Sequence, residues 1–141
     1  MGANSFYEEH ATLVTSVAAA MKTVEVDVSR LPAAPTRSQL ATLAAAVAHA
    51  HASLERVSSW KIAGQGEEGA EEEDVPRAET QVAEGAEALI AAMSALQVFA
   101  RTPSANILTH YDTEFANGRI SWNEGVFQLW YLAHKSNPPK L

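Results

Sequence analysis

The sequence predicts an all-α protein, an up-down antiparallel helical bundle with three long helices, one short helix and one aromatic C-terminal helix. In three long segments, apolar residues recur at helical spacings of three and four. Short breaks rich in proline or glycine separate most of the segments, and short connections favour antiparallel neighbours. No alternation of apolar and polar residues lasts long enough to indicate a β-sheet. With 141 residues, 47% of them hydrophobic, the chain suits one domain, residues 1–141, with a substantial core.

The first helix is predicted to run from about residue 4 to residue 29. Ser5 and Glu8 have the spacing of a capping box, in which a hydroxyl and a carboxylate satisfy free backbone amides of the first turn. The apolar stripe of this helix consists of Phe6, His10, Leu13, Val17, Ala20 or Met21, and Val24. Two prolines in segment 31–35 then end the helix and stiffen the connection.

The second helix is predicted to begin at Thr36 or Ser38 and to end near Trp60 or Ile62. Its apolar stripe consists of Leu40, Leu43, Val47, His51, Leu54 and Val57. Residues 64–75 then carry glycines and acids with almost nothing apolar to bury, so we expect a mobile, solvated loop. Its acids are Glu67, Glu68, Glu71, Glu72, Glu73 and Asp74.

The acidic loop accounts for most of the net charge of the chain, which is −7. It is interpreted either as a solubilising linker or as a docking segment for a basic partner. The remainder of the chain is nearly neutral and has no basic stripe that could neutralise phosphates. This distribution argues against nucleic-acid binding and against binding to an anionic membrane.

The third helix is predicted to begin at Pro76, which suits a first helical turn, and to end at the break Thr102-Pro103-Ser104. Its apolar stripe consists of Val82, Ala86, Leu89, Ile90, Met93, Leu96 and Ala100. A short helix over residues 104–112 and a turn at Asn117-Gly118 are expected to follow it.

The final helix is predicted over residues 122–135, because Ser121 and Glu124 have capping-box spacing and prolines follow at 138 and 139. Six of the ten aromatic residues of the chain lie between residues 111 and 131. One side of this helix carries Trp122, Val126, Leu129 and Ala133, and the opposite side carries Phe127, Tyr131 and His134. A helix that is apolar on two sides either lies inside its own domain or packs partly against another chain.

Residues 112–124 resemble the calcium loop of the EF-hand family. The resemblance is carried by Asp112, Glu114, Asn117, Gly118, Ile120 and Glu124. It implies a calcium site built from the oxygens of this loop. Counted from Asp112, however, the glycine is seventh and the last glutamate thirteenth, each one place later than in the family. An ordinary turn followed by a helix cap is the favoured interpretation.

His10 and His51 lie on the apolar stripes of the first two helices, and Glu9 adjoins His10. Antiparallel pairing of these helices would bring the two imidazoles near each other, so one hypothesis is a metal ion or small ligand held between the helices. The alternative is that each imidazole is hydrogen-bonded inside the bundle. The Glu-x-x-His motif of di-metal bundles does not occur here, and the favoured interpretation includes no metal and no cofactor.

The leading functional hypothesis is a non-enzymatic protein–protein interaction module that binds a protein partner or itself as a homo-oligomer. The chain has no cysteine, no Gly-x-Ser-x-Gly nucleophile motif and no phosphate-binding glycine loop, so no catalytic residue is expected. The absence of cysteine fits a cytoplasmic protein. No signal peptide and no membrane-spanning run are expected. The predicted partner-binding residues are Phe127, Trp130, Tyr131 and His134.

Overall fold

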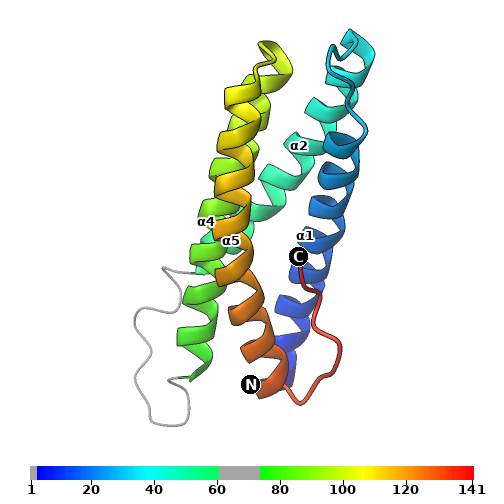
Figure 1. The fold of residues 1–141 in the computed structure, drawn as a ribbon. Coiled ribbons are helices and arrows are strands. Elements are labelled where there is room, and N and C mark those ends of the chain that lie inside the picture. Colours follow the sequence, from blue (N-terminus) through cyan, green and yellow to red (C-terminus); the bar gives the residue numbers. More distant parts are fainter. Residues whose placement is uncertain (1–2, 61–73) are drawn as a thin grey trace.

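The structure, a computed structural model, describes residues 3–60 and 74–141, with side chains described for 10–60 and from 77 onward. The described residues form four α-helices and no strand: α1 (Ala3–Ser29), α2 (Arg37–Ser58), α4 (Asp74–Arg101) and α5 (Ala105–Leu132) (Figure 1). The predicted all-α bundle is confirmed. The predicted acidic loop lies outside the described residues, except for residues 74–75, which begin α4.

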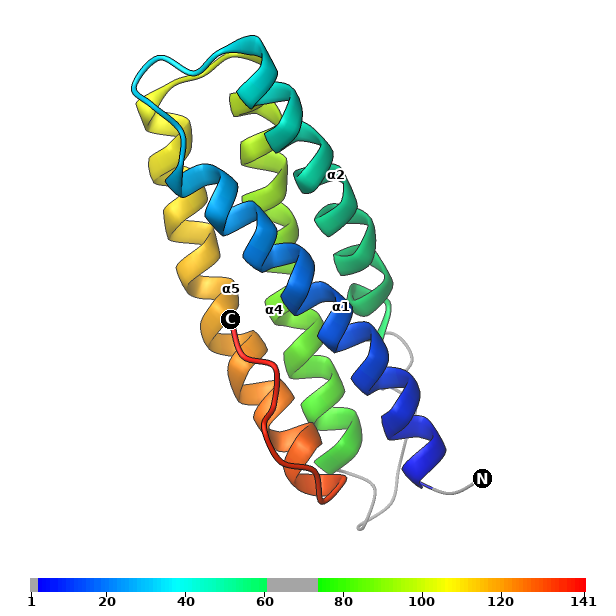
Figure 2. The same ribbon diagram turned by 90° about the vertical axis from the view of Figure 1, so that its right-hand side faces the viewer.

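The helices run alternately up and down, and the connections α1–α2 and α4–α5 lie at the same end of the bundle (Figures 1 and 2). The α2 helix packs against both α1 and α4, and the most extensive contact of the bundle is between α4 and α5. All four helices contribute buried side chains to one core, of which Trp122, Met21, Leu43, Leu54 and Leu89 are among the largest.

The starts and ends of the first three described helices lie close to their predicted positions. Thr36 caps α2: its hydroxyl accepts a hydrogen bond from the Gln39 amide at 3.1 Å, and its own amide donates to the Gln39 side chain at 2.9 Å. This reciprocal pair satisfies two donors that the helix cannot satisfy itself. The predicted Ser5 cap is wrong as a helix start, because α1 begins at Ala3.

The predicted turn at Asn117-Gly118 is wrong, because α5 runs without a break from Ala105 to Leu132. The predicted short helix and the predicted aromatic helix are therefore one helix. The capping box at Ser121 does not form, and the residue at the N-cap of α5 is Ser104. The EF-hand resemblance is wrong for the same reason, since residues 112–124 are helical throughout and form no ligand loop.

Three glycines explain why α5 stays helical through Asn117-Gly118. A Cβ atom added at Gly85 of α4 would lie 2.5 Å from the backbone nitrogen of Trp122, and one at Gly118 would lie 3.0 Å from the Gly85 carbonyl oxygen. One at Gly125 would lie 2.7 Å from the Val82 backbone nitrogen. Glycine is therefore used here for backbone contact between helices and not for a turn.

The contact between α4 and α5, which we call the glycine seam, repeats along both helices. On α4 it comprises the buried residues Ala78, Val82, Gly85, Leu89, Ala92, Leu96 and Phe99. On α5 it comprises the buried residues Tyr111, Phe115, Gly118, Trp122, Gly125 and Leu129. Their alternating spacings of four and three are those of antiparallel helices packed along their length. The opposite side of α5 is consequently turned away from α4.

The chain reverses direction after α5 through a Schellman motif. The Lys135 amide donates to the Trp130 carbonyl at 2.9 Å and the His134 amide donates to the Tyr131 carbonyl at 3.1 Å, with His134 at φ 56°. This pattern ends helices with a left-handed residue. The C-terminal tail, residues 133–141, then runs back along α5 toward the middle of the bundle (Figure 2). There the Asn123 side-chain amide pairs with the backbone of Leu141, accepting at 2.8 Å and donating at 3.1 Å.

Replacing His134 with glycine is expected to raise the free energy of unfolding by about 0.5 to 1 kcal/mol. Glycine adopts a positive φ without the steric cost that a Cβ atom brings. Chemical denaturation of the two proteins at one concentration measures the change. Ser136→Gly serves as the control, because Ser136 has no positive φ and gains nothing from glycine. Equal effects of the two substitutions would contradict the assignment of His134 as the left-handed cap.

The α4 segment Arg77–Arg101 is long and apolar enough to span a membrane by length and composition. The expectation that no run in the sequence meets this test is therefore wrong. In the bundle, 56% of the most apolar stretch of this segment is buried, as is usual for a helix that belongs to a protein core.

Candidate protein-binding surface

Three large apolar side chains project from the side of α5 that faces away from the glycine seam. Ile120, Phe127 and Tyr131 are 59%, 60% and 68% exposed. They stand seven and four residues apart, so they fall within about 40° of one another around the helix. We call Ile120, Phe127 and Tyr131 the α5 stripe. Because α5 is continuous, the three side chains form one row, which a break at Gly118 would have shortened at the Ile120 end.

Of the four residues predicted to bind a partner, two lie on the α5 stripe and two do not. Phe127 and Tyr131 are exposed as required. Trp130 is only 7% exposed and belongs to the core of its own bundle. His134 is exposed, but its backbone forms the left-handed cap described above. Sequence reasoning missed Ile120, although its position seven residues before Phe127 is a usable signal once α5 is known to be unbroken.

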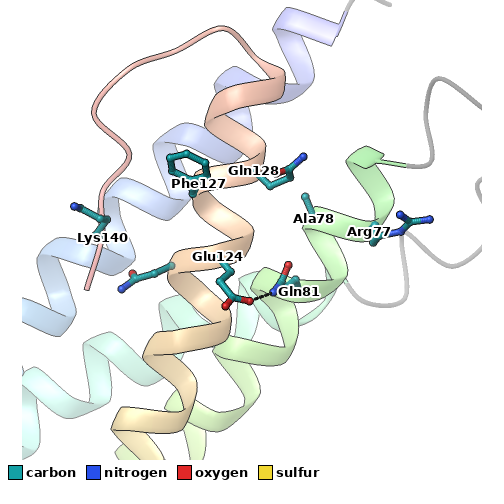
Figure 3. Close-up of a pocket in the computed structure, with 8 residues that line it drawn as sticks. Arg77, Ala78, Gln81, Glu124, Phe127, Gln128 and Lys140 are labelled. Carbon is teal, nitrogen blue, oxygen red and sulfur yellow. Dashed lines mark hydrogen bonds between the residues drawn. The ribbon is translucent and has the colours of Figure 1, made fainter.

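An open groove of about 520 Å³ lies beside the α5 stripe, between α4, α5 and the C-terminal tail (Figure 3). It is lined by Arg77, Ala78, Gln81, Asn123, Glu124, Phe127, Gln128 and Lys140. The Phe127 ring supplies apolar surface, and the cationic ends of Arg77 and Lys140 belong to opposite borders, one on α4 and one on the tail. The groove therefore combines an aromatic anchor with a polar rim, as binding surfaces on proteins commonly do.

Two hydrogen-bonded contacts hold the borders of this groove in place. The Gln81 side-chain amide donates to the Glu124 carboxylate at 2.6 Å and so links α4 to the outer side of α5 (Figure 3). On the other border, the Asn123 amide pairs with Leu141, as described above, and fixes the end of the tail. Glu124 thus pairs with a neighbouring helix, where the sequence suggested a helix cap or a calcium ligand.

The two histidines considered as metal ligands contact different carboxylates. His10 Nε2 lies 3.0 Å from Glu79 Oε2, with side chains that are only 11% and 7% exposed. The His10 ring also stacks on Trp60, with ring centroids 3.9 Å apart. His51 instead pairs with Glu55, one turn further along α2, at 2.8 Å. The structure brings His10 to α4 and does not bring it to His51.

Glu79 is the only buried charged residue within residues 10–60 and 77–141. Its pairing with His10 joins helices whose residues stand 69 positions apart in the sequence. The Glu9 side chain lies outside the described residues. Among the residues that the structure describes, no group of three or more His, Asp or Glu side chains is placed to hold a metal ion. The His10–Glu79 pair is therefore a polar contact that joins α1 to α4.

Tyr111, in the N-terminal half of α5, is buried. Its burial, together with the charges of Glu25 and Asp112, raises its pKa well above the ordinary value of 10. The unfolded chain loses this proton first as the pH rises. The stability that neutral Tyr111 contributes is thus complete below about pH 10 and is lost above it.

Tyr111→Phe is expected to flatten the alkaline limb of the stability profile by up to about 1.4 kcal/mol for each pH unit above 10. Phenylalanine keeps the buried ring and has no proton to lose. Urea denaturation at several pH values between 9 and 12 measures the slope. Tyr131→Phe changes an exposed tyrosine and serves as the matched control. If the stability of Tyr111→Phe falls with pH as steeply as that of the control, Tyr111 is not responsible for the loss of stability at alkaline pH.

Comparison with protein-family models, with curated proteins and with solved structures gave no match for this chain.

Proposed function

We propose that this protein is a non-enzymatic interaction module that binds another protein chain through the α5 stripe and the adjoining groove. The single observation that carries the proposal is the exposure of Ile120, Phe127 and Tyr131 in one row on a helix whose other side is buried. Large apolar side chains gathered on one face commonly mark protein–protein contacts. Aromatic side chains supply much of the binding energy at such contacts.

The surroundings of the row support the same function. The glycine seam holds α5 against α4, so the row is presented by a rigid element. Gln81 and Asn123 fix polar borders on both sides of Phe127, and such borders favour a defined orientation of the partner. In this proposal the role of the bundle is to hold one face of α5 in a fixed shape.

Tyr131→Asp is expected to abolish binding while leaving the bundle folded, because it places a charge on the α5 stripe and replaces a side chain that is 68% exposed, so that little buried area is lost. Wild type and variant are immobilised and exposed to a lysate of the source cells, and the retained proteins are identified by mass spectrometry. Sedimentation equilibrium of the same proteins records self-association.

Val98→Asp provides the matched control, since Val98 is an exposed apolar residue of α4, 43% accessible, outside the α5 stripe. Proteins or self-complexes retained by wild type and Val98→Asp but lost with Tyr131→Asp support the proposal. Equal binding by all three proteins would exclude the α5 stripe as the binding surface.

A further inference from the structure

We propose that the end of the C-terminal tail, residues 138–141, occupies a site on α5 that also accepts an extended segment of the partner chain, and that the partner displaces the tail when it binds. This inference rests on the proposed function and adds to it the chemistry of the partner segment and an autoinhibitory contact. Three features of the molecule carry it: the way Asn123 holds Leu141, the position of Asn123 within the α5 stripe, and the composition of the tail.

Asn123 holds the tail through backbone groups. Its side-chain nitrogen donates to the Leu141 carbonyl oxygen at 3.1 Å, and its side-chain oxygen accepts from the Leu141 amide at 2.8 Å. A residue in an extended strand presents the same two groups to the residue opposite it in a β-ladder. Every residue except proline carries both groups. Asn123 is therefore able to hold an extended segment of another chain in the way it holds Leu141.

The tail contact adjoins the α5 stripe directly. Asn123 lies three residues after Ile120 and four residues before Phe127, so it is a neighbour of both on the surface of the helix. Lys140 of the tail lines the same groove as Phe127 (Figure 3). A chain that covers the stripe and enters the groove must therefore meet the end of the tail. The partner gains the Asn123 amide as a binding group if it takes the place of the tail.

The composition of the tail indicates which partner segment fits. The rings of Pro138 and Pro139 are half-buried, and the side chain of Leu141 is half-buried and packs against the core. Prolines restrict a segment before it binds, and proline-rich segments dock on surfaces that expose aromatic rings, as Phe127 does here. The partner segment that fits this site is therefore extended, with prolines followed by an apolar residue whose backbone pairs with Asn123.

The attachment of the tail is small enough to exchange. Residues 134–137 and Lys140 are exposed, and none of the side chains of residues 136–141 is fully buried. Segments with few buried contacts open far more readily than the core of the same protein. The tail is thus expected to leave Asn123 without unfolding α5, which ends at Leu132.

Leu141→Pro opens the site in the full chain, because proline has no amide hydrogen to donate to Asn123 and the leucine side chain is lost. A synthetic peptide of residues 136–141 is titrated to millimolar concentration into wild type and variant, and the side-chain amide signal of Asn123 is followed by NMR. The peptide is expected to bind Leu141→Pro about tenfold more tightly than wild type, as for a site that is free about one tenth of the time in wild type. Lys140→Ala alters an exposed side chain, keeps the pair with Asn123 and should bind the peptide as wild type does.

Adding Asn123→Ala to Leu141→Pro should abolish peptide binding, with the helical content checked by circular dichroism. Absence of binding to Leu141→Pro, equal affinity for wild type and Leu141→Pro, or unchanged affinity without Asn123 would overturn the proposed site.

The lysate experiment described above separates this inference from the proposed function. Leu141→Pro should retain several times more of the proteins that Tyr131→Asp loses, because the tail no longer competes with them. If Leu141→Pro retains no more than wild type while Tyr131→Asp still loses proteins, the displacement of the tail is wrong and the α5 stripe remains the binding surface. If Tyr131→Asp loses nothing that wild type retains, the proposed function itself fails.

Discussion

Replacing Gly85 with alanine is expected to lower the free energy of unfolding by about 2 to 3 kcal/mol. Alanine is the better helix former by about 1 kcal/mol, so the loss must come from packing. The added Cβ atom would lie 2.5 Å and 2.9 Å from the backbone nitrogen and Cα of Trp122, and backbone atoms cannot rotate aside as a flexible side chain can. The two helices must therefore move apart and give up contacts along the glycine seam.

Equilibrium denaturation by urea measures this loss, and Asn117→Ala is its matched control. Asn117 is exposed on α5 beside Gly118. If residue 117 is helical, alanine should raise the free energy of unfolding by about 0.5 kcal/mol. Stabilisation of the bundle by Gly85→Ala would contradict backbone contact at the seam, and destabilisation by Asn117→Ala would favour a turn at residues 117–118.

His10→Ala is expected to lower the free energy of unfolding by about 3 kcal/mol, whereas His51→Ala should cost less than about 0.5 kcal/mol. Removing the His10 imidazole leaves the Glu79 carboxylate buried without the group it is paired with, and removal of one member of a buried pair is strongly destabilising. It also removes the ring that stacks on Trp60. The partner of His51 is the largely exposed Glu55 side chain, and exposed pairs contribute little.

Both variants are compared with wild type by thermal and chemical denaturation at pH 7. Metal analysis of the same samples addresses the alternative in which both histidines hold one ion. Equal losses for the two variants, together with bound metal that either substitution removes, would favour that alternative over separate pairing with Glu79 and Glu55.

Local sequence signals predicted the helices that begin and end at strong breaks. The Thr36 cap, the prolines of segment 31–35 and the break at residues 102–104 all act through the backbone of a few neighbouring residues, so they can be recognised without knowing the fold. Pro76 predicts the start of α4 two residues after its actual start at Asp74.

Local signals failed where contact with another helix decides the structure. Asn117-Gly118 is typical of a turn, and Ser121 and Glu124 have the spacing of a cap, yet both pairs lie inside α5. The glycine is needed because the backbone of α4 approaches at Gly85, and nothing near Gly118 in the sequence reports that approach. Tertiary packing therefore overrules the turn signal here.

The candidate surface could be predicted in part. Placing Phe127 and Tyr131 opposite Trp122 and Leu129 follows from helical periodicity alone, and the burial of Trp122 and Leu129 agrees with it. The burial of Trp130 and the partner of His10 depend on how distant segments meet. Glu79 stands 69 residues from His10, and no pattern in the sequence joins them.

The proposed function requires that α5 has one side buried in its own bundle and the other side free for a partner. The most direct measurement is the free energy of unfolding of the double variant Phe127→Ala, Tyr131→Ala, at a concentration where the protein is monomeric. We expect a value within about 1 kcal/mol of wild type, since both side chains are mostly exposed and alanine favours the helix. A loss of several kcal/mol would show that both side chains belong to the core and would exclude a free outer side of α5.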